Sequence, residues 1–149
     1  MRLISVDPGV TGAVAVFDLG NLVELHDMPV NDGVSAAGVA QLVHQLRPDR
    51  AVVERLQAMP GNGSIASYKS GRGMGILEGV LAARLVPVEL VRPARWKRDL
   101  RLSSDKGRSR ARACELFPQH AGLFGRVKDD GRAEAALIGW WWCETHPTR

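Results

Sequence analysis

Two short apolar runs, each closed by an acid, constrain the fold of this chain more than any other feature. Residues 3–7 read Leu-Ile-Ser-Val-Asp, and residues 51–54 read Ala-Val-Val-Glu. Buried strands are built from aliphatic and β-branched residues, so an acid at the last position leaves the core and faces the crevice beyond the sheet. Ligands of open α/β sheets bind in that crevice. We therefore interpret Asp7 and Glu54 as candidate metal-binding carboxylates.

The first half of the chain has the pattern of a meander followed by a helix and a returning strand. Three short strands are separated by turn-forming residues, at residues 3–7, 12–17 and 22–28. Ser35 can cap a helix whose apolar residues have helical spacing, and Pro48 ends this helix before the strand at 51–54. This order predicts a mixed sheet.

The second half alternates helical and strand patterns. A glycine-bearing loop at 57–65 precedes a predicted helix at 67–85 and a fifth strand at 86–91. Three further helices are expected, at 93–100, from a cap at Ser103 or Ser104 to 116, and from about 130 to 144. The fold class is therefore α/β, with a five-stranded mixed sheet and helices on both faces. At 149 residues, the chain has the length of a single domain, residues 1–149.

The positive charge of the chain is concentrated in one segment. The formal net charge is only +4. Between Arg92 and Arg112 there are nine Lys and Arg residues against two Asp, a local balance of 9 − 2 = +7, so the remainder is net acidic. A solvated helix face would explain such a segment, but we favour an interface that neutralises phosphates.

A third acidic cluster opens the last helical pattern, at residues 129–134. Asp130 and Glu134 are four residues apart and share a helix face. Together with Asp7 and Glu54, this cluster brings three distant acidic stretches within reach of one site, and clustered carboxylates can hold the divalent cations that serve hydrolysis of a phosphodiester. Hard oxygen donors favour Mg²⁺, with Mn²⁺ as a substitute. The sequence thus indicates a metal-dependent nuclease.

Each of these acids also has a simpler interpretation. Asp7 could be the first residue of a Pro-Gly turn, and Asp130 could cap a helix. Glu54 could pair with Arg55 or Arg132 at a sheet edge.

Other metal and membrane chemistry is not indicated. Cys114 and Cys143 have neither the spacing of a zinc site nor that of a disulfide framework. No apolar run has the length of a membrane span, and we expect no membrane partner. These features favour a soluble protein of the cytoplasm.

Six basic residues are candidates for binding DNA: Lys69, Arg72, Lys97, Lys106, Arg108 and Arg110. The last three begin a predicted helix, whose amides would reinforce phosphate binding. Trp96 could stack on a base, but we favour a core anchor. Trp140 to Trp142 span about 200° of helix surface, so one ring is expected to need a subunit interface.

The order of these motifs resembles the RuvC-type Holliday junction resolvases of the RNase H-like superfamily, in their compact phage-encoded branch. The resemblance covers nearly the whole chain, and no single motif in it is specific. The matching motifs are Asp7-Pro8-Gly9-Val10-Thr11-Gly12, the strand-ending Glu54, the glycine-spaced segment 71–79, Pro93-Ala94-Arg95-Trp96-Lys97, Ser104-Asp105-Lys106 with Arg110, Leu116-Phe117-Pro118, and Gly131-Arg132-Ala133-Glu134-Ala135.

The resemblance implies a fold and a catalytic site. The first and fourth strands would be parallel neighbours, and four catalytic metal ligands would converge, namely Asp7, Glu54, Asp130 and Glu134. Asp129 is an alternative to Asp130. Family members often carry an acid three residues before the last one, where this chain has Gly131. The site would hold two Mg²⁺ ions.

The resemblance also implies partners and products. The substrate would be branched DNA in the form of a four-way junction, cut by paired nicks that leave 5′-phosphate and 3′-hydroxyl ends. A homodimer would supply two sites related by a two-fold axis. The protein would act in a bacterial cytoplasm, or as a phage protein in that of the host.

Three other functions remain open at this point. An RNase H-like nuclease acting on hybrids, flaps or other branched nucleic acid would use the same carboxylates. A branched-DNA-binding protein without catalytic activity would need only the basic segment. An actin-like phosphotransferase would share the turn at residues 7–12, but it normally requires two such domains, for which 149 residues are too few. We therefore expect no nucleotide cofactor.

Overall fold

A five-stranded mixed sheet forms the centre of the molecule, as expected. The computed structural model describes residues 1–57, 61 and 63–147. The strand order is β3-β2-β1-β6-β7, in which β1 to β3 are antiparallel and β6 and β7 run parallel to β1. The bounds are β1 Arg2–Asp7, β2 Ala13–Asp18, β3 Asn21–Asp27, β6 Arg50–Glu54 and β7 Val88–Val91.

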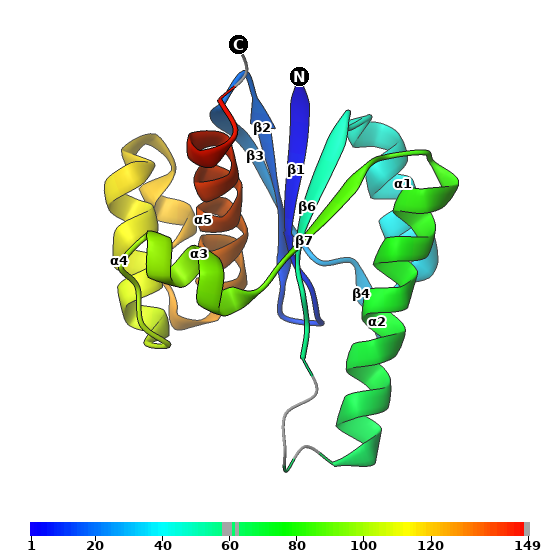
Figure 1. The fold of residues 1–149 in the computed structure, drawn as a ribbon. Helices are drawn as coiled ribbons and strands as arrows, with labels where there is room; N and C mark the ends of the chain where they lie inside the picture. The colour runs from blue at the N-terminus through cyan, green and yellow to red at the C-terminus, as the bar shows by residue number, and fades with distance from the viewer. Residues whose placement is uncertain (58–60, 62, 148–149) are drawn as a thin grey trace.

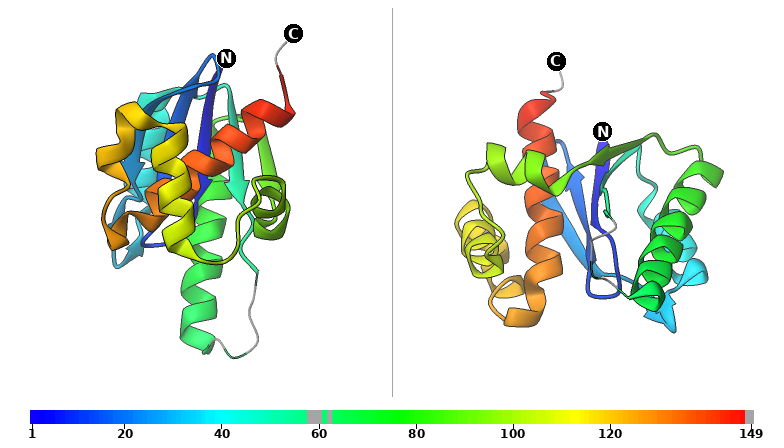
Figure 2. Two further views of the ribbon diagram at one scale, coloured as in Figure 1. Left: turned by 90° about the vertical axis from the view of Figure 1, so that its left-hand side faces the viewer. Right: turned by 60° about the horizontal axis from the view of Figure 1, so that its bottom comes forward.

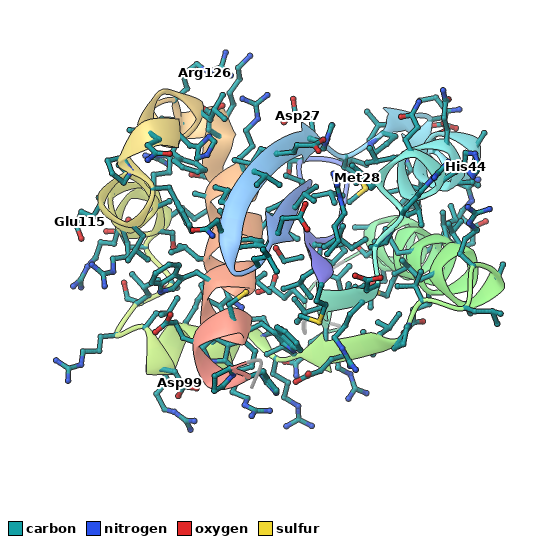
Figure 3. All side chains as sticks on the ribbon, turned by 90° about the horizontal axis from the view of Figure 1, so that it is seen from above. Asp27, Met28, His44, Asp99, Glu115 and Arg126 are labelled. Carbon is teal, nitrogen blue, oxygen red and sulfur yellow. The ribbon has the colours of Figure 1, made fainter. Side chains whose placement is uncertain are left out.

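Helices cover both faces of the sheet (Figures 1 and 2). One face is covered by α1 (Ala36–Leu46) and α2 (Ser64–Ala83), and the other by α3 (Pro93–Asp99), α4 (Lys106–Leu116) and α5 (Asp130–Thr145). Side chains fill the space on both sides of the strands (Figure 3). None of the helices in the described part of the chain combines the length and apolar character that a membrane span requires.

Strand β1 divides the core because its side chains alternate between the two faces. Leu3 joins the apolar cluster beneath α5, whereas Ile4 and Val6 join the cluster beneath α1 and α2. Ser5 points to the α5 side and donates a hydrogen bond from Oγ to the carbonyl of Ala135, at 2.7 Å. A strand that is buried on both faces reads as a continuous apolar run, and this explains residues 3–6.

Helix starts follow the expected caps with two differences. Ser35 caps α1 through Gly38, as predicted. Helix α2 begins at Ser64 rather than 67, since Gly63 can serve as its cap. Helix α4 is capped by Asp105, not by Ser103 or Ser104, because the Asp105 carboxylate accepts from the amide of Gly107.

Some short elements were not predicted. The strand at 86–91 starts at Val88 in the structure, after Pro87, which has no amide to donate. Two two-residue strands form a separate hairpin, and two 3₁₀ segments precede α5. These elements are β4 (Val30–Asn31), β5 (Gly33–Val34), η1 (Pro118–Leu123) and η2 (Val127–Asp129).

The three consecutive tryptophans all find partners within the chain, and the subunit interface expected for one ring stays a prediction. Trp141 and Trp142 are buried, and Trp140 is half-buried with its ring edge-on to Phe117, at 5.8 Å between centroids. The helix is covered on several sides, by the sheet, by α4 and by α3. Three rings spread over a wide arc can therefore all pack.

The close approach of α5 to the sheet depends on Gly139. A Cβ at this position would lie 2.2 Å from Phe17 Cε2 and 2.5 Å from Ser5 Oγ. We predict that Gly139→Ala destabilises the protein by about 1–3 kcal/mol through overpacking, as measured by urea denaturation.

The control is Gly79→Ala on α2, where a Cβ meets nothing within 4 Å. Removing a glycine from an open helix position should stabilise the protein by about 0.5–1 kcal/mol. Equal effects of the two substitutions would contradict the packing argument.

Candidate functional site

Strand register places Asp7 and Glu54 side by side. Val6 pairs with Val53 in the parallel ladder, so the next residue of each strand leaves the sheet at the same level. Each strand ends at its acid. The family resemblance implied that the first and fourth strands are parallel neighbours, and the observed pairing of β1 with β6 confirms it.

The turn after Asp7 needs its glycines for backbone reasons. Gly9 has φ +116°, and the amide of Gly12 donates to the carbonyl of Gly9 at 3.1 Å. A Cβ on Gly12 would lie only 1.9 Å from the carbonyl oxygen of Asp7. The tight return of the chain onto Asp7 thus explains both glycines.

Glu134 of α5 completes a cluster of three acids. One carboxylate oxygen from each of Asp7, Glu54 and Glu134 lies within 4.8 Å of the others. All three side chains are buried, with exposed fractions of 9, 6 and 4%. The three segments that the sequence marked as acidic therefore meet at the carboxyl ends of β1 and β6.

Burial and mutual repulsion disfavour the charged forms of these acids. Burial raises the pKa of the Asp7 carboxyl well above its usual value, and the charges of Glu54 and Glu134 raise it further. Burial likewise raises the pKa of Glu54, with a contribution from Glu134, although a hydrogen bond from Trp96 acts in the opposite direction. Positive charge close to these three carboxylates would therefore stabilise their ionised forms.

Two lysines that we predicted to bind DNA contact this cluster: Lys97 is largely buried, whereas the side chain of Lys106 is exposed. Lys97 Nζ donates to Glu134 Oε1 at 2.7 Å, and Lys106 Nζ lies 3.8 Å from Glu134 Oε2. Two ammonium groups face three carboxylates, which leaves an excess of one negative charge if all of them are ionised. Hard carboxylate oxygens gathered in this way fit Mg²⁺ or Mn²⁺.

The structure does not bring Asp130 into the cluster. Its carboxylate forms a salt bridge with Arg110, another residue predicted to bind DNA. The alternative ligand, Asp129, is held by Arg126, whose side-chain hydrogen bonds lower the pKa of the Asp129 carboxyl. Within the described residues, the candidate metal group thus contains three of the four acids that we predicted.

The missing acid at position 131 has a steric explanation. A Cβ on Gly131 would lie 2.2 Å from the carbonyl oxygen of Thr11 and 2.9 Å from Gly12 Cα. The first turn of α5 therefore packs directly against the turn between β1 and β2. Neither an acid nor any other side chain fits at position 131 without moving that turn.

The simpler interpretation of Glu54 as a partner of Arg132 does not hold. Arg132 makes a bidentate contact with Asp27, at 2.6 and 2.7 Å. Glu54 instead accepts a hydrogen bond from Trp96 Nε1, at 2.9 Å.

Trp96 is the site residue whose role the sequence reasoning missed. It is fully buried, which confirms the prediction of a core anchor. Its contact with Glu54 could have been found from the chain order, because Val91 of β7 pairs with Glu54 and α3 starts two residues later. The first turn of such a helix necessarily lies near the end of β6.

The remaining DNA-binding candidates lie on exposed surface. Lys69 and Arg72 line a hollow of about 400 Å³, together with Tyr68 and residues 31–33 of the β4–β5 hairpin. The first half of α2 is exposed and projects beyond the ends of the strands (Figure 1). Arg108 is exposed on α4.

Comparison with known proteins places this arrangement in a known fold. No family model matches the chain. The chloroplastic Holliday junction resolvase MOC1 of Chlamydomonas reinhardtii is 38% identical over 91 residues, which are 60% of this chain and 10% of that protein. The chain thus spans no more than a small part of the length of this relative.

Solved structures match over almost the whole chain. RuvC of Thermus thermophilus, in complex with a Holliday junction substrate, has a TM-score of 0.69 at 18% identity, covering 97% of this chain and 96% of that one. The fowlpox virus Holliday junction resolvase has a TM-score of 0.62 at 21% identity, covering 98% and 100%. The yeast mitochondrial resolvase Ydc2 has a TM-score of 0.61 at 12% identity, covering 94% and 78%. The chain has the RuvC-type, RNase H-like fold.

The raised pKa of Asp7 predicts how the metal-free protein responds to pH. A carboxyl whose pKa is higher in the folded state than in the unfolded state costs stability, and this cost grows as pH rises from about 3.8 to the folded pKa. Above that window the cost is fully present. Asp7→Asn removes it and should raise the Tm of the metal-free protein at pH 7 by several degrees, since each kcal/mol corresponds to about 2–4 °C.

Thermal unfolding in a chelator at several pH values tests this expectation. The Tm difference between the variant and the wild type should shrink as pH falls toward 4. Glu78→Gln, which changes an exposed acid on α2, is the control. A lower Tm for Asp7→Asn at pH 7 would mean that the cluster is not under electrostatic strain.

Proposed function

We propose that this chain is a structure-selective endonuclease that resolves four-way DNA junctions by metal-dependent hydrolysis of phosphodiesters. The observation that carries the proposal is the group of three buried carboxylates within 4.8 Å at the ends of two central parallel strands. The fold supports it, as do the similar proteins, which are named as Holliday junction resolvases.

The metal would be held by Asp7, Glu54 and Glu134. We propose two Mg²⁺ ions, which Mn²⁺ can replace, because the donors are carboxylate oxygens. Bound cations would supply an activated water and stabilise the leaving 3′-oxygen, giving 5′-phosphate and 3′-hydroxyl ends. Asp130, with Asp129 as the alternative, remains our proposal for a fourth ligand, and it requires that Arg110 first release its carboxylate.

The two lysines give the site its own positive charge. Lys97 and Lys106 approach Glu134 from α3 and α4, and their ammonium groups lie beside the carboxylates that would face the scissile phosphate. When cations take over the neutralisation of Glu134, these ammonium groups become free to contact the anionic phosphate oxygens. We assign them to the reaction centre rather than to the outlying DNA surface.

DNA would cross the end of the molecule where the strands stop. The carboxyl ends of β1 and β6 are flanked by the projecting half of α2 on one side and by the starts of α4 and α5 on the other (Figure 2, right). Lys69 and Arg72 lie on the first of these elements and Arg108 on the second. Basic groups on both sides of the acids suit a substrate that approaches along several arms.

The acids are tested by Glu54→Gln and Asp7→Asn with a mobile four-way junction, Mg²⁺ and mapping of the nicks on each strand. Each substitution removes a ligand charge, so cleavage should fall to background. Junction binding should persist, because the basic surfaces are unchanged. The control Glu78→Gln, at an exposed acid on α2, should cut normally. Full turnover by either site variant would remove that residue from the site.

A second candidate is a nuclease of the same fold that acts on hybrids, flaps or other branched nucleic acid, since the same three carboxylates would serve it. Cleavage rates on a four-way junction, a flap and an RNA–DNA hybrid discriminate the two. A preference for the hybrid or flap would favour the second candidate. Junction binding without any cleavage in Mg²⁺ or Mn²⁺ would favour a binding protein without catalytic activity.

Paired cleavage predicts a homodimer. A four-way junction is cut in two strands of like polarity, and two sites related by a two-fold axis reach both strands. Light scattering at micromolar concentration should give about twice the 16.2 kDa of one chain. A protein that is monomeric both alone and on junction DNA would contradict this part of the proposal.

A further inference from the structure

Trp96 connects α3 to the acid cluster by a contact that goes beyond packing. Its indole Nε1 donates to Glu54 Oε1 at 2.9 Å, and the ring is fully buried. The two residues are 42 positions apart in the chain. Helix α3 starts with Pro93 directly after β7, whose Val91 pairs with Glu54. The helix therefore brings the indole to Glu54 from a fixed direction.

The neighbouring residue carries the same helix to a second acid. Lys97 Nζ bonds Glu134 and also lies 5.1 Å from the centroid of the Trp96 ring. One turn of α3 thus holds two of the three carboxylates, one through a neutral donor and one through a cation. Any tilt of the indole would shift both contacts together.

We propose that Trp96 is a positioning residue, which orients the Glu54 carboxylate for metal binding. An indole N–H donates but does not accept, and it neither ligates a metal nor transfers a proton at neutral pH. By holding Oε1, the indole N–H fixes one oxygen of the Glu54 carboxylate and thereby sets the direction of the other. A donor that orients a ligating carboxylate typically contributes about 10–100-fold to metal affinity. The proposal rests on the function proposed above, because it takes Glu54 to be a metal ligand.

A purely structural role makes a different prediction, and the chain contains a matched control. Trp141 is also buried, and its Nε1 donates to Asp99 Oδ2 at 2.9 Å. A cation, Arg95, lies 5.1 Å from its ring centroid. Asp99, labelled in Figure 3, ends α3 and is outside the acid cluster. The two tryptophans therefore match in burial, in hydrogen bond and in cation contact, but differ in the acid they hold.

The experiment compares Trp96→Phe with Trp141→Phe in the full chain. Both substitutions keep an aromatic ring and delete one N–H donor to a carboxylate. Both variants should lose some Tm, Trp96→Phe more because Glu54 is buried and Asp99 is partly exposed. The Mn²⁺ Kd should rise about 10–100-fold only in Trp96→Phe, as measured by calorimetric titration. An unchanged Kd in folded Trp96→Phe, or an equal rise in both variants, would overturn the proposal.

A second measurement needs no folded Trp96 variant. The chain has four tryptophans, so its ¹⁵N-labelled form gives four indole N–H signals in NMR spectra. Phe variants at positions 140, 141 and 142 assign three of them, and the fourth belongs to Trp96. On titration of wild type with Mg²⁺, this fourth signal should shift the most. A fourth signal that stays in place while Mg²⁺ binds would overturn the proposal.

The outcomes for the two proposals are distinguishable. A wild type that binds Mn²⁺ but cuts no branched substrate would contradict the proposed nuclease and leave the role of Trp96 at the metal site standing. A wild type that binds neither Mg²⁺ nor Mn²⁺ at millimolar concentration would contradict both.

Discussion

Repulsion among Asp7, Glu54 and Glu134 is the constraint to which the rest of the site responds. Three carboxylates with little exposure to water lie within 4.8 Å of one another, and burial and mutual charge raise the pKa values of Asp7 and Glu54. Removing carboxylates from water costs free energy unless partners restore the lost interactions. A cation bound by the three carboxylates would offset this free-energy cost, so the cluster fits a metal site. The lysines and the indole of Trp96 offset part of the cost in the metal-free protein.

The packing of α5 decides how closely the third acid can approach the other two. Gly139 allows the middle of the helix to press on Phe17, and Gly131 allows its first turn to press on the β1–β2 turn. Those contacts fix the helix at two points and leave Glu134 between them, above the ends of β1 and β6. The same closeness removes position 131 as a source of a fourth ligand. The close packing of α5 against the sheet therefore also limits the number of acids that can reach the site.

Much of the fold was predictable because it depends on local patterns, whereas the site depends partly on contacts between distant elements. The acid-ended runs, the caps and the periodicities were sufficient for the five strands and the five main helices. The pairing of Asp130 with Arg110 was not predictable, since the spacing of acids on one helix does not reveal which cation a neighbouring helix presents. For the same reason, we assigned Lys97 and Lys106 to the basic segment between Arg92 and Arg112 and not to the acid cluster. Whether a lysine faces solvent or an acid is decided by α3 and α4 packing beside α5.

The partners of these basic residues suggest how the site could change when DNA and metal bind. In the structure, Lys97 and Lys106 contact Glu134 and Arg110 contacts Asp130, so basic side chains that could bind phosphates are paired with acids that could bind metal. Metal binding would free the basic side chains from the acids, and DNA binding would free the acids from the basic side chains. Binding of metal and binding of DNA should therefore strengthen each other, as linkage between two sites requires.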